Sequence, residues 1–221
     1  MTDLGKPLMG NMTPYQFTNN WFDAVAKASW DQLMARYRLA RLLEIGSYEG
    51  ASACYLIDTL APRYPIELHC IDSWEGGVEH QAGGDAPADM NTVEQRFHRN
   101  VSLAAGKYVG RTELVVHKGH SDECLAGLIA GGKKGYFDFV YVDGSHQAAD
   151  VLTDAVLGFR LLKVGGVIAF DDYLWSEQLP SGKDPLRCPK PAIDAFVNLH
   201  FRKLEVLSAP LYQLYVQKLS D

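Results

Sequence analysis

Segments with the pattern of buried strands alternate with segments of helical pattern five times along this chain. The strand-like runs are short and apolar, whereas the helical runs are longer and carry apolar residues three or four positions apart. This alternation predicts βαβ units, and therefore a doubly wound α/β fold with a mostly parallel sheet. The predicted strands span residues 41–46, 66–72, 112–119, 137–143 and 167–172, and the predicted helices span residues 50–61, 90–104, 121–130, 146–162 and 190–200.

Further elements flank this alternation. Residues 13–38 have a helical pattern, with Thr13 and Gln16 as a capping box, Pro14 at the first helical position and a break near residues 27–29. At the other end, residues 203–209 and 211–218 predict an antiparallel strand pair, which brings the sheet to seven strands. We therefore expect an N-terminal helical extension over residues 1–38 and one α/β domain over residues 39–221.

A polar cluster follows each of the five predicted strands. Parallel strands end at the same edge of a sheet, and doubly wound sheets bind their ligands beyond that edge. The sequence therefore predicts one site built from all five clusters. They lie at residues 46–50, 72, 118–120, 143–146 and 171–172.

The first cluster, EIGSYEG, is a glycine-containing strand-to-helix turn. A dinucleotide fingerprint, G-x-G-x-x-G, would need glycine where this chain has Tyr48, so a pyrophosphate ligand is disfavoured. Glu44, just before Gly46, suits a cationic ligand better. Asp72 ends the second predicted strand, where a carboxylate can accept hydrogen bonds from both hydroxyls of a ribose. The alternatives are a plain turn at Gly46 and Gly50 and a turn cap at Asp72.

The succession LLEIGSYEG, LHCIDSWEGG, VVHKGHSDECL, FDFVYVDGSH and LLKVGGVIAFDDY resembles class I S-adenosylmethionine-dependent methyltransferases over residues 40–218. The resemblance implies a Rossmann-like methyltransferase fold. It also implies that the loop at residues 46–50 borders the methionine part of the cofactor, that Asp72 binds its ribose and that residues 119–121 lie near its adenine. The implied cofactor-binding residues are Glu44, Gly46, Ser47, Gly50, Asp72, Ser73, Trp74, Gly119, His120, Ser121 and Asp143.

The pair VDGSH and AFDD is similar to the macrocin and mycinamicin O-methyltransferases and to the cephalosporin hydroxylase-like proteins. That resemblance implies a Mg²⁺ ion, or another divalent cation, held by Asp143, Asp171 and Asp172, with Asp143 and His146 as the catalytic residues and His146 as the base. The chemistry agrees, because three neighbouring carboxylates repel one another unless a cation lies between them. The alternatives are helix capping at Asp143, a loop start at residues 171–172 and a solvent-facing His146.

Composition narrows the classes of partner. The net charge is −6 and no Lys/Arg-rich stripe is present, which argues against nucleic acid. No apolar run reaches the length of about 18 residues that a membrane helix needs, and the first residues lack a secretory pattern. The four cysteines form no CxxC pair, so a zinc site is not indicated. We expect a cytoplasmic protein that forms homo-oligomers through residues 13–38.

The predicted function is methyl transfer from S-adenosylmethionine to a hydroxyl of a sugar or natural-product small molecule, assisted by the metal. Three alternatives remain open: a catechol-type or other methyl acceptor, a non-catalytic domain that binds the cofactor as a scaffold, and an NAD-dependent oxidoreductase. The loop at residues 73–90 is a predicted lid, with Trp74 as a wall of the site, and Tyr173 and Trp175 form a predicted platform for a ring.

Overall fold

The computed structural model describes residues 15–84, 86–177, 179 and 182–221. Its strands form one seven-stranded sheet in the order β3-β2-β1-β4-β5-β7-β6, in which β7 runs antiparallel to β5 and β6 runs antiparallel to β7. The other neighbours are parallel, so the predicted sheet is confirmed. The strands are β1 (Arg41–Ile45), β2 (Ile66–Asp72), β3 (Thr112–Lys118), β4 (Phe137–Val142), β5 (Leu162–Phe170), β6 (Leu204–Leu207) and β7 (Leu214–Lys218).

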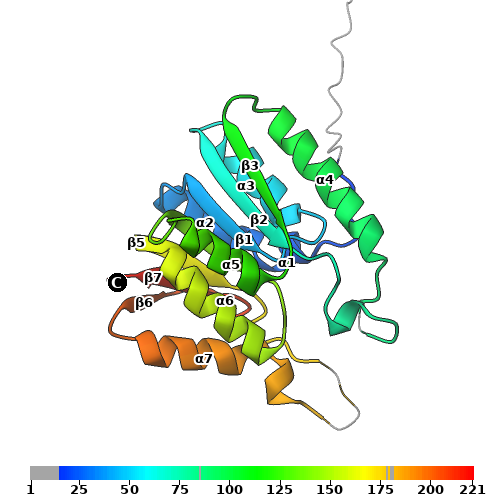
Figure 1. Ribbon diagram of the computed structural model, residues 1–221, viewed down its shortest axis with the longest axis vertical. Coiled ribbons are helices and arrows are strands. Elements are labelled where there is room, and N and C mark those ends of the chain that lie inside the picture. The colour runs from blue at the N-terminus through cyan, green and yellow to red at the C-terminus, as the bar shows by residue number, and fades with distance from the viewer. Residues whose placement is uncertain (1–14, 85, 178, 180–181) are drawn as a thin grey trace, which may run out of the picture.

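Helices cover both faces of the sheet. Figure 1 shows α5, α6 and α7 in front of the sheet and α2 and α3 behind it. The helices are α1 (Trp21–Val25), α2 (Lys27–Arg36), α3 (Ala51–Leu60), α4 (Met90–Gly106), α5 (Ser121–Ala130), α6 (Ala148–Leu161) and α7 (Pro189–His200), with 3₁₀ turns η1 (Val78–His80) and η2 (Pro185–Arg187).

Two apolar cores lie on the two faces, because successive residues of a strand point to opposite sides. Leu42 of β1 packs in the core beneath α2, α3 and α4, and Leu43 packs in the core beneath α5, α6 and α7. Trp30 of α2 is fully buried and meets Phe139 and Tyr141 of β4 edge-on, with ring centroids 5.2 and 4.7 Å apart. The first helices thus pack on the sheet, while the domain boundary at residue 38 stays a prediction.

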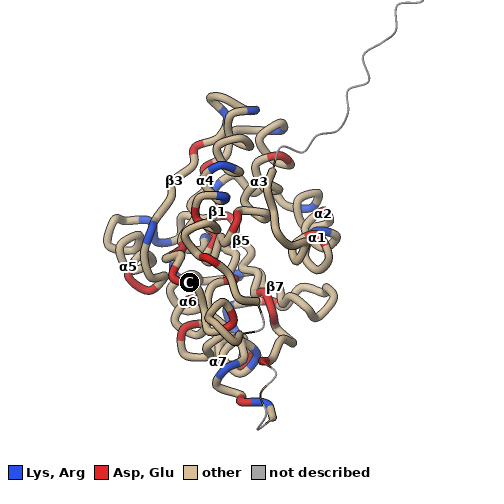
Figure 2. Tube along the Cα trace, turned by 90° about the vertical axis from the view of Figure 1, so that its right-hand side faces the viewer, with Lys and Arg blue, Asp and Glu red and all other residues tan. Residues whose placement is uncertain are grey.

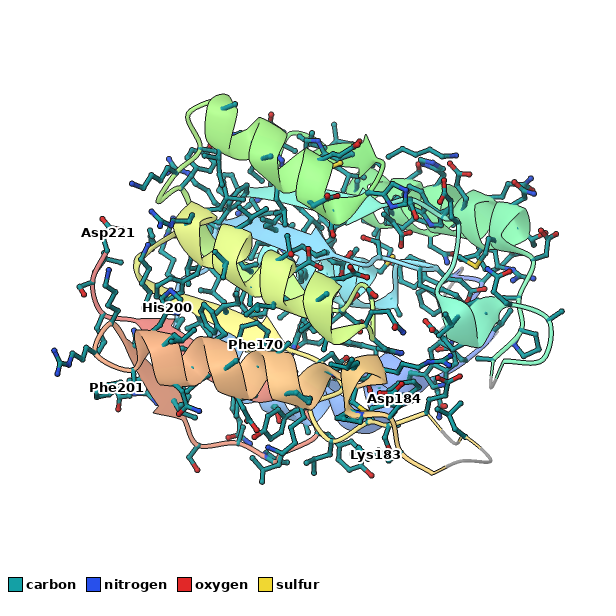
Figure 3. All side chains as sticks on the ribbon, turned by 60° about the horizontal axis from the view of Figure 1, so that its bottom comes forward. Phe170, Lys183, Asp184, His200, Phe201 and Asp221 are labelled. Atoms are coloured by element: carbon teal, nitrogen blue, oxygen red, sulfur yellow. The ribbon has the colours of Figure 1, made fainter. Side chains whose placement is uncertain are left out.

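Helix α7 closes the second core over β5. Phe196 packs against Phe170 with ring centroids 5.6 Å apart. Figure 3 shows Phe170 beside α7, with Asp184 near the beginning of this helix and His200 and Phe201 near its end. This packing holds the end of β5 in place, directly before Asp171 and Asp172.

The predicted helix over residues 13–38 is wrong over its first turns. Thr13 and Pro14 lie outside the described residues, and residues 15–20 are not helical, so α1 begins only at Trp21. Side chains from other elements hold the backbone here: Gln16 N–H donates to Asn100 Oδ1 at 2.8 Å, and Thr18 N–H donates to Glu49 Oε2 at 2.7 Å. These hydrogen bonds satisfy the backbone N–H groups of Gln16 and Thr18 without a helix. The predicted break appears at Ala26, between α1 and α2.

Several other boundaries differ from the prediction. Helix α4 extends two residues beyond the predicted range 90–104, and Asp89 caps it, because its carboxylate accepts from Asn91 N–H and Thr92 Oγ1. Helix α6 begins at Ala148, two residues later than predicted. Strand β5 begins at Leu162, which pairs with Phe137, and a register shift follows before Phe139.

Charged residues of both signs are distributed along the chain. Figure 2 shows Lys and Arg interspersed with Asp and Glu along the Cα trace. Within the described part of the chain, no helix is long and apolar enough to cross a membrane.

Candidate functional site

The site lies where the strand order reverses, between the ends of β1 and β4. Gly46 follows β1 with φ +83°, and a Cβ placed on it would lie 1.9 Å from the carbonyl oxygen of Asp143, which follows β4. Only glycine therefore permits the two loops to approach this closely. The close approach brings the first and fourth predicted polar clusters together.

Asp72, at the end of β2, organises the loop after β1. Its Oδ2 accepts the backbone N–H groups of Ser47 at 2.8 Å and Tyr48 at 2.9 Å, and its Oδ1 accepts the N–H of Trp74 at 2.7 Å. Tyr48 and Trp74 have positive φ angles of 47° and 50°, which the carboxylate helps to stabilise. Asp72 is thus a structural anchor of the loop as well as a residue that faces the cavity.

A cavity of about 590 Å³ extends from these loops toward α5. Its lining brings together residues from four of the predicted clusters, with Ser73 and Ser121 beside them: Gly46, Asp72, Gly119, His120, Asp143 and His146. No lysine or arginine is present among the described residues that line it, whereas Glu75, Asp122 and Asp150 add acidic groups. This electrostatic environment favours a cationic ligand over a diphosphate.

A second cavity, of about 280 Å³, adjoins the first. Its lining includes seven Phe, Tyr or Trp rings, which come from the N-terminal segment, the loop after β1, β4, the loop after β5 and the turn before β7: Phe17, Trp21, Phe22, Tyr48, Tyr141, Trp175 and Tyr212. The two cavities share Tyr48, Glu79, His80, Asp143, Gly144 and His146. A ligand in one cavity can therefore react with a ligand in the other at this boundary.

His146 lies at that boundary and is held from both sides. Its Nε2 is 2.9 Å from Asp172 Oδ2, its ring lies 4.0 Å from that of Trp175, and its buried Nδ1 has no hydrogen-bond partner. Glu79 Oε2 is 3.7 Å from Nδ1. Burial lowers the pKa of His146, but the hydrogen bond and charge of Asp172 and the charge of Glu79 outweigh burial and raise the pKa above its ordinary value. Nδ1 is thus placed to take up a proton.

Three carboxylates gather beside His146. Burial, followed by the charges of Asp171 and Asp172, raises the pKa of Asp143 well above its ordinary value. Burial and the charge of Asp172 raise the pKa of Asp171 to about 6. Asp171 accepts a short hydrogen bond from the buried Tyr141 hydroxyl, and its Oδ1 accepts the N–H of Asp172 at 2.9 Å. Burial and mutual repulsion thus both oppose the charged form of Asp143 and Asp171.

A family model described as a methyltransferase domain matches residues 43–173, more than half of the chain. This chain belongs to the methyltransferase-domain family. A curated relative, an uncharacterized protein of Acanthamoeba polyphaga mimivirus, is 26% identical over 142 residues, which are 62% of this chain. The chain spans about half of that relative's length, since the match covers 54% of it.

Solved methyltransferase structures share the fold. An O-methyltransferase from Bacillus cereus in complex with SAH matches with a TM-score of 0.60 at 17% identity, over 87% of this chain and 80% of that one. TomG from Streptomyces achromogenes, an O-methyltransferase in complex with SAM, matches with a TM-score of 0.59 at 19% identity, over 88% of this chain and 80% of that one. A TDP-rhamnose 3′-O-methyltransferase of calicheamicin biosynthesis matches with a TM-score of 0.53 at 16% identity, over 86% of this chain and 76% of that one. These likenesses confirm the predicted fold.

The predicted metal centre of the methyltransferase domain stays a prediction. Among the residues that the structure describes, no three His, Cys, Asp or Glu side chains are grouped as a metal site. Asp171 is hydrogen-bonded to Tyr141, and Asp172 is hydrogen-bonded to His146. The oxygen donors of Asp143, Asp171 and Asp172 are of the kind that suits a hard cation.

Some residues predicted to bind the cofactor of this methyltransferase lie behind the cavity walls. Glu44 is fully buried and accepts hydrogen bonds from Ser47 and Ser52. Trp74 is 5% exposed, packs against Phe97 and donates to Tyr48 O at 3.0 Å. Gly50 is the N-cap of α3, with φ +81°, and faces Phe97, and Ser47 lines the second cavity instead of the first. Of the two predicted platform residues, only Trp175 lines a cavity. The hydroxyl of Tyr173 instead donates a hydrogen bond to Asp194 and accepts one from Lys190.

Sequence reasoning missed Glu79, which lies in η1 and lines both cavities of the methyltransferase. It also missed Tyr141, whose hydroxyl lies beneath Asp171. No sequence pattern indicated Glu79, because a 3₁₀ turn within a glycine-rich loop has no recurring apolar positions. For Tyr141 the signal was its place in β4: it is two residues before Asp143 and thus on the same face of the strand.

Proposed function

We propose that this protein is an O-methyltransferase that transfers a methyl group from S-adenosylmethionine to a hydroxyl of a small molecule. The observation that carries the proposal is the meeting of two cavities at His146, whose Nδ1 is buried and free of a hydrogen bond. Membership of the methyltransferase-domain family supports methyl transfer as the reaction.

The larger cavity suits S-adenosylmethionine. The Gly46 loop is the close backbone turn that borders the methionine part, Asp72 is available to the ribose hydroxyls, and residues 119–121 line the far end where the adenine would bind. Bound there, S-adenosylmethionine supplies an electrophilic methyl group on a sulfonium. The acidic lining, without lysine or arginine among the described residues, favours this cation over NAD.

The chain's own residues account for the proton transfer. The Nε2–H of His146 donates to Asp172, which leaves the Nδ1 lone pair free at the cavity boundary. A hydroxyl bound in the smaller cavity gives its proton to Nδ1 as its oxygen attacks the methyl group. Positioned bases of this kind contribute about 10² to 10⁴ in rate. Asp143, at the same boundary, lies where it can orient the hydroxyl.

Divalent metal assistance stays a prediction from the sequence. No step above passes through a metal. The hydrogen bonds to Tyr141 and His146 each use one carboxylate oxygen of Asp171 and Asp172, so both residues keep lone pairs with which they would hold an ion. Methyl transfer measured with EDTA, and then with excess Mg²⁺, decides between transfer with and without the ion.

A sugar or other natural product is the proposed acceptor class. The second cavity's volume, about 280 Å³, suits a single ring or a small pair of rings. One structural neighbour is a TDP-rhamnose 3′-O-methyltransferase, which supports a sugar hydroxyl. Homo-oligomerisation through the N-terminal helices and a cytoplasmic location remain part of the proposal.

Calorimetry tests the cofactor first. S-adenosylhomocysteine should bind with micromolar or better affinity, and NAD should not bind. Tight NAD binding in place of S-adenosylhomocysteine would sink the proposal in favour of an oxidoreductase. A panel of sugar, catechol and phenol acceptors, run with and without EDTA, then tests the reaction. If His146→Ala leaves the methyl transfer rate unchanged, the assigned base is wrong.

A further inference from the structure

The acceptor cavity combines aromatic rings with carboxylates. Tyr48, Tyr141 and Trp175 line its inner part, and Phe17, Trp21 and Tyr212 line its outer part, where each is at least 36% exposed. The carboxylates are those of Glu49, Glu79, Asp143, Asp171 and Asp172. No lysine or arginine is present among the described residues of this lining.

Two of the five carboxylates have a cationic partner. Glu49 Oε1 is 2.8 Å from Arg96 Nη1, which lies outside the lining. Asp172 is bonded to His146, which offsets its charge when the ring is protonated.

The other three carboxylates have no close cationic partner among the described residues. Glu79 has longer contacts, 3.5 Å to His80 Nε2 and 3.7 Å to His146 Nδ1, and Asp171 is bonded to a neutral tyrosine. The raised pKa of Asp143 favours its neutral form, so it adds little charge. Glu79 and Asp171 therefore leave the cavity an excess of negative charge that the described residues do not neutralise.

Aromatic faces and uncompensated carboxylates attract the same kind of ligand. A protonated amine gains from the negative faces of Trp and Tyr rings and from the carboxylates, by about 0.5–2 kcal/mol for each good cation–π contact. A phosphate or carboxylate on the acceptor would face repulsion from the same groups, with no lysine or arginine of the described lining to bind it.

We propose that the natural acceptor is a ring that carries a protonated amine close to the hydroxyl to be methylated, and that anionic acceptors such as nucleoside diphosphate sugars are excluded. The inference rests on the proposed methyl transfer and names the substrate class of the same cavity. The amine lies against Glu79 and the aromatic wall, and the hydroxyl points at His146 Nδ1. Amino sugars and aromatic amines share this chemistry.

Binding of matched probes tests the proposal. One set is tyramine, 4-ethylphenol and 4-hydroxyphenylacetate, and the other is methyl glucosaminide, methyl glucoside and glucose 6-phosphate. Tryptophan fluorescence reports binding, since Trp21 and Trp175 line the cavity, and S-adenosylhomocysteine and EDTA are present throughout. In at least one set the cationic member should bind about tenfold tighter than the neutral one, with no binding of the anion. The set that shows this preference identifies the type of ring.

Two variants distinguish a direct contact of the amine with Glu79 from a long-range effect of the protein's net charge. Glu79→Gln should remove most of the preference for the cation while leaving the affinity for the neutral probe within about twofold. Glu205→Gln, on the exposed face of β6, changes the net charge equally and should leave the preference intact. Equal changes in both variants would show only a long-range effect of net charge and would overturn the assignment of the amine to this cavity.

The remaining outcomes separate this inference from the function it rests on. If S-adenosylhomocysteine does not bind, the proposed function fails. If it binds and the neutral or anionic probe binds as well as the cation in both sets, only the inference fails. Replacing EDTA by excess Mg²⁺ provides a further test, because a switch of preference to the anionic probe would mean that the carboxylates serve a metal instead of an amine.

Discussion

His146 Nε2 lies 2.9 Å from Asp172 Oδ2, and this contact joins the loop after β4 to the loop after β5. Asp172 makes it from a left-handed backbone conformation, φ 53°, which is rare for a residue with a side chain. The contact fixes the ring and leaves Nδ1 buried, without a hydrogen bond and 3.7 Å from Glu79 Oε2. A pair of residues held in this way orients the histidine and favours its protonated form.

His146→Ala should lower kcat by about 10² to 10⁴, because the acceptor hydroxyl loses its base. S-adenosylhomocysteine affinity should change little, since the cofactor cavity keeps its other walls. Rate measurement and calorimetry on the same preparation check the two expectations. Loss of cofactor binding together with activity would instead indicate that the ring supports the shape of the cavity.

Asp172→Asn should move the pH dependence of the rate rather than abolish it. The base must be neutral to accept a proton, so the rate rises with pH through the pKa of His146. Burial lowers this pKa and Asp172 raises it, with the second effect winning. Removing the charge therefore lowers the pKa, and the acidic limb of the kcat profile should shift to lower pH. An unchanged limb would mean that His146 is not the group being titrated.

Gly46→Ala should disrupt the site through the backbone. The new methyl group would lie 1.9 Å from Asp143 O, so the loops after β1 and β4 must separate. We expect at least a tenfold loss of S-adenosylhomocysteine affinity and a free energy of unfolding lower by about 2 kcal/mol or more. Gly110→Ala is the matched control, because Gly110 has φ +75° and nothing within 4 Å of its Cβ position. It isolates the cost of positive φ, about 1 kcal/mol. Equal losses of stability in the two variants would show that the close approach of Gly46 to Asp143 O is not the cause.

The sheet and the location of the site were predictable for a simple reason. The strand-like runs are apolar on both faces because helices cover both, and their polar ends must then gather at one edge. Thus Gly46, Asp72 and Asp143 could be placed together without knowledge of any distance. The match of β1 and β2 to their predicted bounds within one residue shows how strong this pattern is.

What could not be predicted depends on side-chain direction and on loops. Glu44 and Trp74 lie next to the edge in sequence, yet the first points under the loop to Ser47 and the second packs on Phe97. Three adjacent carboxylates suggested one metal, but hydrogen bonds to Tyr141 and His146 give two of them separate partners. No pattern in the sequence encodes these rotamers.

Asp154→Asn should stabilise the protein at alkaline pH. Asp154, on α6, is 1% exposed, and among the described residues neither carboxylate oxygen has a partner at hydrogen-bond geometry. Burial raises its pKa from 3.8 to about 7, although the nearby Ser121 hydroxyl lowers this pKa slightly. The folded state thus holds the proton more tightly than the unfolded chain, so stability is fully present below about pH 4 and is lost as pH rises through about 7. The difference of about 3 pH units corresponds to about 4 kcal/mol at most.

The asparagine removes the charge but keeps a buried polar group, so we expect about half of that limit, about 2 kcal/mol, at about pH 8.5. Urea unfolding at several pH values measures the difference, which should shrink toward about pH 4 because the wild-type carboxyl is then protonated as well. Asp23→Asn, whose side chain is 67% exposed on α1, should stay within about 0.5 kcal/mol of the wild type at every pH. A stabilisation of Asp154→Asn that does not vary with pH would show that this carboxyl has the same pKa in the folded and the unfolded chain, and that its burial does not set the alkaline stability.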